Sequence, residues 1–239
     1  MKLDEVRKLH QKKFRDQLGH FIVEGEHLVL ELQKAARRDP RLLQSELFVT
    51  REHAHWDSPF ETQVVTEAQM GRISDTRKPQ GMVAVVPVVP APGPGADERA
   101  VYLHEIQDPG NLGTILRSLA WFGGIRCLLS PDSVDPYNPK VVRASMGAIF
   151  HVPVETDVAL EALPGRFARI GCLDMQGERL TADDFRHCDC YVFGNEARGL
   201  PRASLAALGA QPFTIPGRGA IESLNLASVV GMCLYELNR

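Results

Sequence analysis

The stretch Tyr191-Val-Phe-Gly194-Asn195-Glu196-Ala-Arg198-Gly199-Leu-Pro201 decides the fold expected for the last part of this 239-residue chain. A short apolar run followed by a glycine-rich turn predicts a buried strand that ends at a tight turn bearing a carboxylate. A second strand and turn, Phe213-Thr-Ile215-Pro216-Gly217-Arg-Gly219, lead through Glu222-Ser223-Leu224-Asn225 into an apolar helix over 223–237. Because α/β folds bind ligands at the carboxyl ends of strands, we expect a site within residues 191–239.

Composition is that of a globular protein without membrane spans. Hydrophobic residues make up 44% of the chain and charged residues 24%, which is typical of soluble domains. No apolar run approaches the roughly 18 residues of a membrane helix. The first residues, Met-Lys-Leu-Asp-Glu-Val-Arg-Lys, lack the apolar core of a signal peptide. We therefore expect a cytoplasmic protein.

The cysteines do not form a metal-binding pattern. They stand at 127, 172, 188, 190 and 233, without C-x-x-C spacing, and Cys188-Asp-Cys190 is too tight for a usual zinc site. We expect reduced thiols packed mostly in the core, and neither a metal site nor disulfides.

The net charge of −3 gives no global basic field that would attract nucleic acid. The charge is uneven, however, because residues 1–15 hold six Lys or Arg against only Asp4 and Glu5. Such a patch could bind phosphate groups or could be the solvated face of a helix, and charge alone leaves both interpretations open.

The order of elements predicts two domains. Helices over 3–18, 26–38 and 67–74, with strands near 21–23, 47–49, 64–65 and 81–86, make residues 1–86 a small α/β domain. Residues 87–99 hold four prolines and two glycines, the composition of a semi-rigid linker. Residues 100–239 alternate more regularly, which predicts a mainly parallel sheet with helices on both faces. Its strands are expected at 101–106, 125–129, 152–154, 170–173, 191–193 and 212–215, and its other helices at 111–122, from 138 onward and at 159–163.

A further polar segment, Gln107-Asp108-Pro109-Gly110-Asn111-Leu-Gly113-Thr-Ile-Leu-Arg117, lies between an expected strand and helix. Taken singly, Asn111 could be the N-cap of that helix and Arg117 an exposed charge. Taken together, an arginine near the start of a helix at a strand's carboxyl end is well placed to hold a phosphate. Similarly, Ser223 could cap the last helix and Glu222 could favour its dipole. The usual glycine fingerprints of dinucleotide and nucleotide-triphosphate sites are absent, which disfavours a nucleotide-dependent oxidoreductase.

The order and spacing of the three segments are more specific than any one of them. Asp-Pro-Gly-Asn-Leu-Gly-x3-Arg, then Phe-Gly-Asn-Glu-x2-Gly-Leu, then Ile-Pro followed by Glu-Ser-Leu-Asn resembles the three motifs of the SpoU (TrmH) RNA ribose methyltransferases of the SPOUT superfamily. The resemblance covers residues 100–239, including Arg143-Ala-Ser-Met-Gly-Ala148. The first half is similar to the small RNA-binding domain of many members, through 21–25 and 74–81.

The resemblance implies a C-terminal deep trefoil knot that binds S-adenosylmethionine, a homodimer, and methylation of a ribose 2′-oxygen in RNA. The motif positions that match the family's active site are Asn111, Arg117, Glu196, Ser223 and Asn225. Those that match its cofactor site are Gly194, Ile215 and Leu224, which hold the cofactor mainly through backbone groups, with Asn195, Gly199 and Gly219 shaping the turns. The turn 217–220, with Arg218, departs from the sequence of many members.

We interpret Lys8, Lys12, Lys13 and Arg15, on the first helix, as candidates for RNA backbone contacts. An N-terminal RNA-binding domain favours ribosomal RNA over transfer RNA as the substrate, by family analogy. The alternatives are a transfer-RNA ribose methyltransferase and a non-catalytic RNA-binding protein on the same fold. The presence of every polar motif position argues against loss of catalysis.

Overall fold

The computed structural model describes residues 1–95, 98–220 and 223–239. Its contacts divide the chain into two units, each described here by itself. The first unit comprises Met1–Pro90 and Asp135–His151, and the second comprises Ala91–Val134 and Val152–Arg239. The segment 135–151 therefore packs with the N-terminal residues, although the sequence-based division at residues 87–99 would place it in the C-terminal domain. That division remains a prediction.

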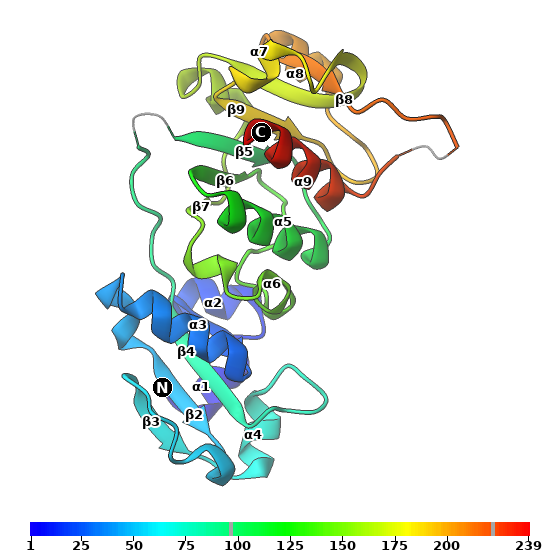
Figure 1. Cartoon of the computed structure of the whole chain (residues 1–239). Helices are drawn as coiled ribbons and strands as arrows, with labels where there is room; N and C mark the ends of the chain where they lie inside the picture. The colour runs from blue at the N-terminus through cyan, green and yellow to red at the C-terminus, as the bar shows by residue number, and fades with distance from the viewer. Residues whose placement is uncertain (96–97, 221–222) are drawn as a thin grey trace. The chain divides into compact units, whose positions relative to one another are not determined.

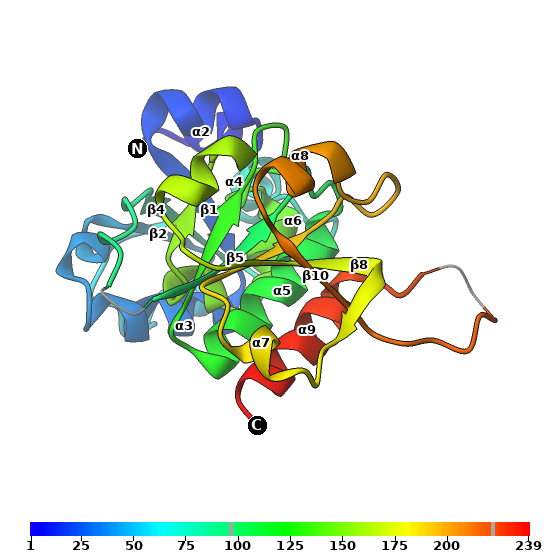
Figure 2. The ribbon, with the colours of Figure 1, turned by 90° about the horizontal axis from the view of Figure 1, so that it is seen from above.

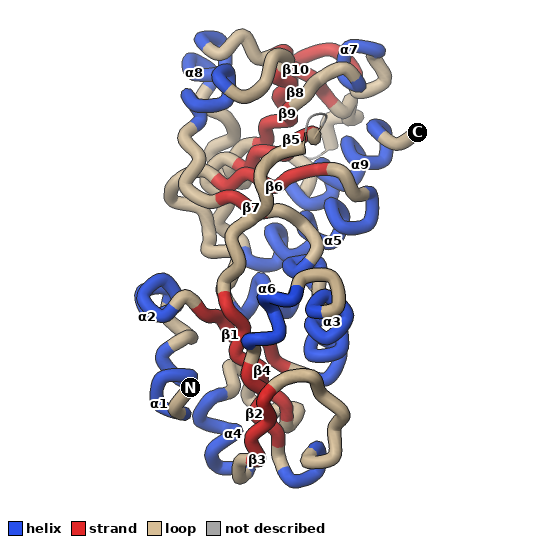
Figure 3. The backbone as a smooth tube through the Cα atoms, turned by 90° about the vertical axis from the view of Figure 1, so that its left-hand side faces the viewer, coloured by secondary structure: helices blue, strands red, loops and turns tan. Residues whose placement is uncertain are grey.

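A parallel sheet forms the core of the second unit. Among the described residues its strand order is β10-β8-β9-β5-β6-β7 (Figure 3). Every ladder between these strands is parallel. The strands are β5 (Arg99–Leu103), β6 (Ile125–Leu129), β7 (Val154–Glu155), β8 (Ile170–Arg179), β9 (Cys190–Phe193) and β10 (Gln211–Thr214). The expected mainly parallel α/β sheet is confirmed.

Helices cover both faces of this sheet, because its strands are apolar on both sides. Figure 2 shows α5 (Pro109–Phe122), α7 (Asp183–Arg186) and α9 (Leu226–Leu237) below the sheet, and α8 (Arg202–Ala207) above it. On the α8 face, Tyr102, Leu128 and Val192 pack with Leu163 of the 3₁₀ helix η4 (Leu160–Gly165). The helix expected at 159–163 is therefore a 3₁₀ helix, which contains Pro164.

A second sheet, of order β1-β4-β2-β3, forms the first unit (Figure 1). Its strands are β1 (His20–Glu24), β2 (Glu46–Val49), β3 (Glu61–Val64) and β4 (Met82–Pro87). Its α-helices are α1 (Leu3–Lys8), α2 (Lys12–Leu18), α3 (Glu26–Ala36), α4 (Glu67–Ile73) and α6 (Pro139–Ser145), and its 3₁₀ helices are η1 (Pro40–Gln44), η2 (Arg51–His53) and η3 (Ala148–Phe150). The apolar core between the sheet and helices α1 and α4 includes Val6, Ile22, Phe48, Met70 and Val83.

The prediction of one helix over 3–18 is wrong in one respect, because the segment forms two helices separated by a turn at residues 9–11. In an unbroken helix, the carbonyl of Leu9 would accept a hydrogen bond from residue 13. Here it accepts one from the guanidinium of Arg15 at 2.7 Å. The ring of His10 also bonds the carbonyl of Ile73, at 3.0 Å. These tertiary contacts favour the break over continued helix.

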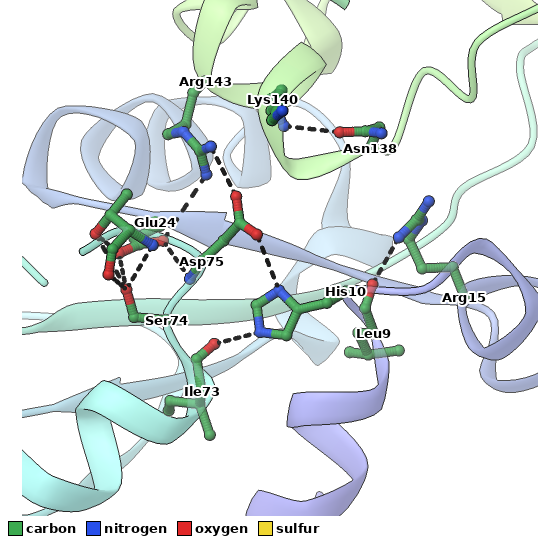
Figure 4. Close-up of polar contacts among 11 residues, drawn as sticks. Leu9, His10, Arg15, Glu24, Ile73, Ser74, Asp75, Asn138, Lys140 and Arg143 are labelled. Atoms are coloured by element: carbon green, nitrogen blue, oxygen red, sulfur yellow. Dashed lines mark hydrogen bonds and ion pairs between the residues drawn. The ribbon is translucent and has the colours of Figure 1, made fainter.

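A polar network connects the segment 135–151 to the rest of the first unit (Figure 4). Arg143 of α6 pairs with Asp75 at 2.7 Å, and the buried Arg15 donates to Asp135 at 2.7 Å. The carboxylate of Glu24, at the end of β1, accepts hydrogen bonds from Ser74, Asp75 and Thr76. One buried glutamate thereby fixes the shape of the loop that begins at Ser74.

The five cysteines are free and buried, which confirms the expectation that they pack in the core. Within the described residues, no group of three or more His, Cys, Asp and Glu side chains is arranged to hold a metal ion. In the same part of the chain, no helix is long and apolar enough to cross a membrane.

Candidate active site

The loop from β5 to α5 presents Asn111 to the site. Asp108 is the N-cap of α5, because its Oδ1 accepts the N–H of Asn111 at 2.7 Å and Pro109 occupies the first turn. Asn111 could have been the N-cap by its position in the sequence, but the structure gives that role to Asp108. The Asn111 side chain is therefore free to make other contacts. Proline at the first helical position after an aspartate is itself a sign of this arrangement.

The loop after β9 is folded tightly and turns Glu196 outward. A Cβ atom on Gly194 would lie 2.4 Å from the carbonyl carbon of Gly199, so only glycine fits there. Asn195 and Gly199 exchange two backbone hydrogen bonds, of 3.0 and 2.9 Å. The buried side chain of Asn195 accepts the N–H groups of residues 197 and 198, at 2.9 and 3.0 Å. These bonds shape the loop from within, and Glu196 is exposed.

Glu196 joins the second polar segment to the first. Its carboxylate accepts hydrogen bonds from the Asn111 side chain at 3.2 Å and from the backbone N–H groups of Gln107 and Asp108, each at 3.3 Å. The third segment joins through Asn225, whose Nδ2 donates to Oδ1 of Asn111 at 2.8 Å. Three segments far apart in the sequence therefore meet in one chain of side chains, Asn225–Asn111–Glu196.

Asn225 also caps α9, since its Oδ1 accepts the N–H groups of Ala227 and Ser228. The helix begins at Leu226, three residues later than expected, and Ser223 is not its cap. The side chain of Ser223 is exposed and makes no hydrogen bond to another residue that the structure describes. Glu222, proposed to favour the helix dipole, lies outside the described residues.

Arg117 is exposed on α5, six residues after Asn111, which is about 9 Å along a helix axis. Within the described part of the chain, its guanidinium makes no hydrogen bond or ion pair. An arginine side chain is always protonated. This charge is therefore available to an anion from outside the protein, although no contact brings Arg117 into the Asn225–Asn111–Glu196 chain.

The expected cofactor residues lie just after β9, just after β10 and just before α9. Ile215 directly follows β10 and is half-buried, while Leu224 is 44% exposed. Gly194, Asn195 and Gly199 form the β9 loop, and Gly219 has a φ of +78°. One exposed and one half-buried apolar side chain, next to glycine-containing turns that a ligand can approach closely, suit a nucleoside, which has an apolar ring face and polar edges. These residues fit S-adenosylmethionine.

The N-terminal basic residues divide into two groups in the structure. Lys8, Lys12 and Lys13, here called the lysine cluster, are exposed. The ammonium groups of Lys8 and Lys13 lie 5.5 and 5.9 Å from the ring centroid of Phe14, so the break between α1 and α2 gathers charge around an aromatic ring. Arg15 is the exception: only 4% of its side chain is exposed, and it is paired with Asp135. We correct its assignment from RNA contact to structural anchor.

The sequence reasoning missed charged residues in each unit. The carboxylate of Glu105, just after β5, pairs with Arg198 of the β9 loop. In the first unit, Arg77 and Lys78 are exposed on the loop shaped by Glu24. A charged residue next to each recognised motif was the available signal. The pairing of Glu105 with Arg198, 93 positions apart, could not be seen in the sequence.

The fold and site define an α/β protein whose polar site lies at the carboxyl ends of parallel strands. The family model of the SpoU rRNA methylase family matches residues 98–235, and the model of the MRM3-like substrate binding domain matches residues 1–84. The chain belongs to the SpoU rRNA methylase family, as its motifs predicted.

Relatives and solved structures extend along almost the whole chain. An uncharacterized tRNA/rRNA methyltransferase of Synechocystis sp. is 32% identical, over 98% of this chain and 89% of its own. The 23S rRNA (guanosine(2553)-2'-O)-methyltransferase RlmP of Bacillus subtilis is 27% identical, over 99% and 95%. A putative TrmH-family RNA methyltransferase from Porphyromonas gingivalis has a TM-score of 0.81 at 29% identity, covering 98% and 96%. An AdoMet-bound rRNA methyltransferase from Sinorhizobium meliloti has a TM-score of 0.82 at 26% identity, covering 99% and 93%.

Proposed function

We propose that this protein methylates a ribose 2′-oxygen in RNA with S-adenosylmethionine as the methyl donor, and that ribosomal RNA is its substrate. The observation that carries the proposal is the Asn225–Asn111–Glu196 chain, which unites the three motifs. Ribosomal RNA is favoured because the relative in Bacillus subtilis and the AdoMet-bound structure are both named as rRNA methyltransferases. Transfer RNA is the alternative, since the Synechocystis relative is named for both.

When bound, S-adenosylmethionine supplies a methyl group on a sulfonium, which is activated for transfer to an oxygen. Gly194, Ile215 and Leu224 would hold it through backbone groups, with the turns at Asn195, Gly199 and Gly219 allowing close approach. Glu196 and Asn111 would orient the ribose, and Ser223 and Asn225 would fix the turn before α9. Alignment of reacting groups can supply about 7–11 kcal/mol of the barrier reduction.

Arg117 would grip the phosphate next to the target ribose and polarise the 2′-hydroxyl. A guanidinium cannot accept a proton, so the proton of the 2′-hydroxyl would pass to a phosphate oxygen or to water as the new oxygen–carbon bond forms. The support for this role is that Arg117 is exposed and, among the described residues, has no anionic partner of its own.

The first unit would bind the RNA backbone outside the reaction centre. The lysine cluster and the exposed Arg77 and Lys78 are candidates, and Phe14 offers a ring on which an unpaired base could stack. The match to a substrate binding domain over residues 1–84 supports this assignment.

We also propose that the catalytic domain is knotted and pairs with a second copy of itself, as the resemblance implies. Large apolar side chains are exposed on α5 and α9: Trp121 is 85% exposed, Tyr235 64% and Met232 45%. Exposed apolar groups of this size are common at subunit interfaces. Measurement of the solution mass would test the dimer.

Substitution of Arg117 tests the proposed chemistry. Arg117→Ala should abolish methyl transfer to RNA but leave S-adenosylmethionine affinity within about twofold, whereas Arg117→Lys should keep part of the activity because it still carries a charge. Arg169→Ala is the matched control, because Arg169 is an exposed arginine just before the first residue of β8, away from the carboxyl ends of the strands. This variant should keep wild-type methyl transfer and cofactor affinity. Loss of cofactor affinity in Arg117→Ala would contradict the division of roles.

Mapping of ribose-methylated positions in RNA from cells with and without the gene would identify the substrate. A missing methyl group in ribosomal RNA would support the proposal. A missing methyl group in transfer RNA alone would favour the alternative, and no change in either, together with no transfer in vitro, would indicate a non-catalytic binding protein.

A further inference from the structure

The backbone of Glu105 has an unusual conformation beside the candidate active site. Its φ is +49°, in the left-handed region that residues other than glycine rarely adopt. Glu105 lies two residues after the end of β5 and precedes the loop that carries Gln107, Asp108 and Asn111. Strained backbone of this kind is often found at functional sites, where surrounding contacts maintain it.

The main chain of Glu105 connects three segments of the second unit. Its N–H donates to Oγ of Ser130 at 2.6 Å, and its carbonyl accepts from the side chains of Asn195 at 2.7 Å and Gln107 at 3.1 Å. Glycine at this position could make all of these bonds without strain. The backbone contacts therefore do not explain why a glutamate stands here.

The carboxylate of Glu105 makes an ion pair with Arg198, and its other oxygen lies 3.8 Å from Nε2 of the neighbouring His104. Arg198 lies two residues after Glu196, and Asn195 lies one residue before it. Glu105 thus holds the β9 loop on both sides of Glu196, with its carbonyl on Asn195 and its carboxylate on Arg198. Because 70% of the Arg198 side chain is exposed, the pair adds little to stability.

We propose that Glu105 is a positioning residue, which fixes the 195–198 loop so that Glu196 meets Asn111. The inference rests on the proposed function for its effect on methyl transfer, but its effect on the loop does not depend on that function. A loose Glu196 would leave Asn111 without its acceptor and would misplace the groups that orient the ribose. Misplacement by about 1 Å can cost about a hundredfold in rate.

Kinetics of three variants test this role. Glu105→Gln should lower kcat for methyl transfer by about ten- to a hundredfold, with the KM for RNA and the affinity for S-adenosylmethionine within about twofold. The paired reversal Glu105→Arg with Arg198→Glu should recover most of the lost kcat, which a merely structural defect would not. Full kcat in Glu105→Gln, or no recovery in the paired reversal, would overturn the proposal.

Glu105→Gly separates positioning from stability. Glycine relieves the left-handed strain, so the unfolding midpoint should be unchanged or higher while kcat falls. Asp157→Gly is the matched control, because Asp157 has a φ of +57° and lies in an exposed turn of the same unit. It should show the same gain in stability with wild-type kcat. A Glu105→Gly enzyme with wild-type kcat would show that the carboxylate has no role.

Amide hydrogen exchange distinguishes failure of this inference from failure of the proposed function. In Glu105→Gln, peptides that cover 194–199 should exchange faster than in the wild type, because the N–H groups of residues 197 and 198 depend on the shape of this loop. Unchanged exchange would overturn the positioning role whatever the activity. Faster exchange in a protein that methylates no RNA would instead refute the function and leave the loop contact standing.

Discussion

Replacement of Glu24 by alanine should destabilise the first unit strongly. Only 4% of this side chain is exposed, and its carboxylate accepts from Oγ of Ser74, from the N–H of Asp75 at 3.1 Å and from Oγ1 of Thr76 at 2.6 Å (Figure 4). A buried donor left without an acceptor costs about 1–3 kcal/mol, and these three donors are partly buried. The hydroxyls of Ser74 and Thr76 lie 3.1 Å apart and can partly satisfy each other. We therefore expect a loss near the lower end, about 3 kcal/mol in total.

Urea unfolding measured separately for each unit provides the assay. Trp56 lies in the first unit and Trp121 in the second, so tryptophan fluorescence in a Trp121→Phe background follows the first unit alone. Glu24→Gln should lose about half as much free energy, because one acceptor oxygen remains. Glu61→Ala, an exposed glutamate on β3, is the matched control and should change the free energy of unfolding by less than about 0.5 kcal/mol.

A loss below about 1 kcal/mol in Glu24→Ala would refute the reasoning, because an average substitution costs as much as that. It would mean that the loop from Ser74 is ordered by contacts other than the buried carboxylate. The prediction also concerns function, because this loop presents Arg77 and Lys78. Loss of its shape should weaken RNA binding even where the unit remains folded.

Three further outcomes are expected. Changing the three residues of the lysine cluster to glutamine should lower the slope of log affinity for RNA against log salt by about two to three, without altering cofactor affinity; an unchanged slope would identify a solvated helix face. The hydrogen bond from Arg166 lowers the pKa of Glu155, so Glu155→Gln should cost up to about 1 kcal/mol of unfolding free energy at pH 7. Because that stabilisation is present above the unfolded pKa and lost as pH falls through the lowered folded pKa, urea midpoints of the two proteins should converge below about pH 4. Burial raises the pKa of the Cys127 thiol to about 12, so a thiol reagent at pH 8 should modify this residue only after unfolding.

Much of the fold follows from local patterns in the sequence. The run Ile125–Leu129 is a strand with the bounds expected, and Asn138 caps α6 as its Asn-Pro signal predicted. The three motifs were expected to converge because each follows a strand in an α/β alternation, and they do. Continuous apolar runs identify strands buried on both faces, and proline and glycine mark where they end.

The features that the sequence did not indicate depend on partners distant in the sequence. The break in the first helix requires Arg15 to bond Leu9, and Arg15 is itself held by Asp135, 120 positions away. The placement of 135–151 with the first unit depends likewise on Arg143 with Asp75 and on Phe21 against Tyr137. Charge counts and periodicity contain no information on such pairs. The cap at Asp108 is different, since Asp-Pro before a helix could have indicated it.

Hydrogen bonding in the site has only one possible direction. The carboxylate of Glu196 can only accept, so Asn111 must turn its Nδ2 toward Glu196 and its Oδ1 toward Asn225. Asn225 must then donate through Nδ2, which leaves its Oδ1 for the N–H groups at the start of α9. Each asparagine is therefore needed as both donor and acceptor. Aspartate could not replace either of them.

Asn111→Asp tests this requirement with a change of very few atoms. The aspartate would still accept the hydrogen bond from Asn225. Its second oxygen, however, would replace the Nδ2 of Asn111, which now lies 3.2 Å from Oε1 of Glu196, so two carboxylates would face each other. Both loops should separate, and kcat for methyl transfer should fall by about a hundredfold. Asn138→Asp is the matched control, because among the described residues the Asn138 side chain bonds only as an acceptor, for the N–H of Lys140 at 2.9 Å. That variant should keep wild-type activity. If Asn111→Asp also kept it, the Asn225–Asn111–Glu196 chain would not be the part of the site that aligns the substrate.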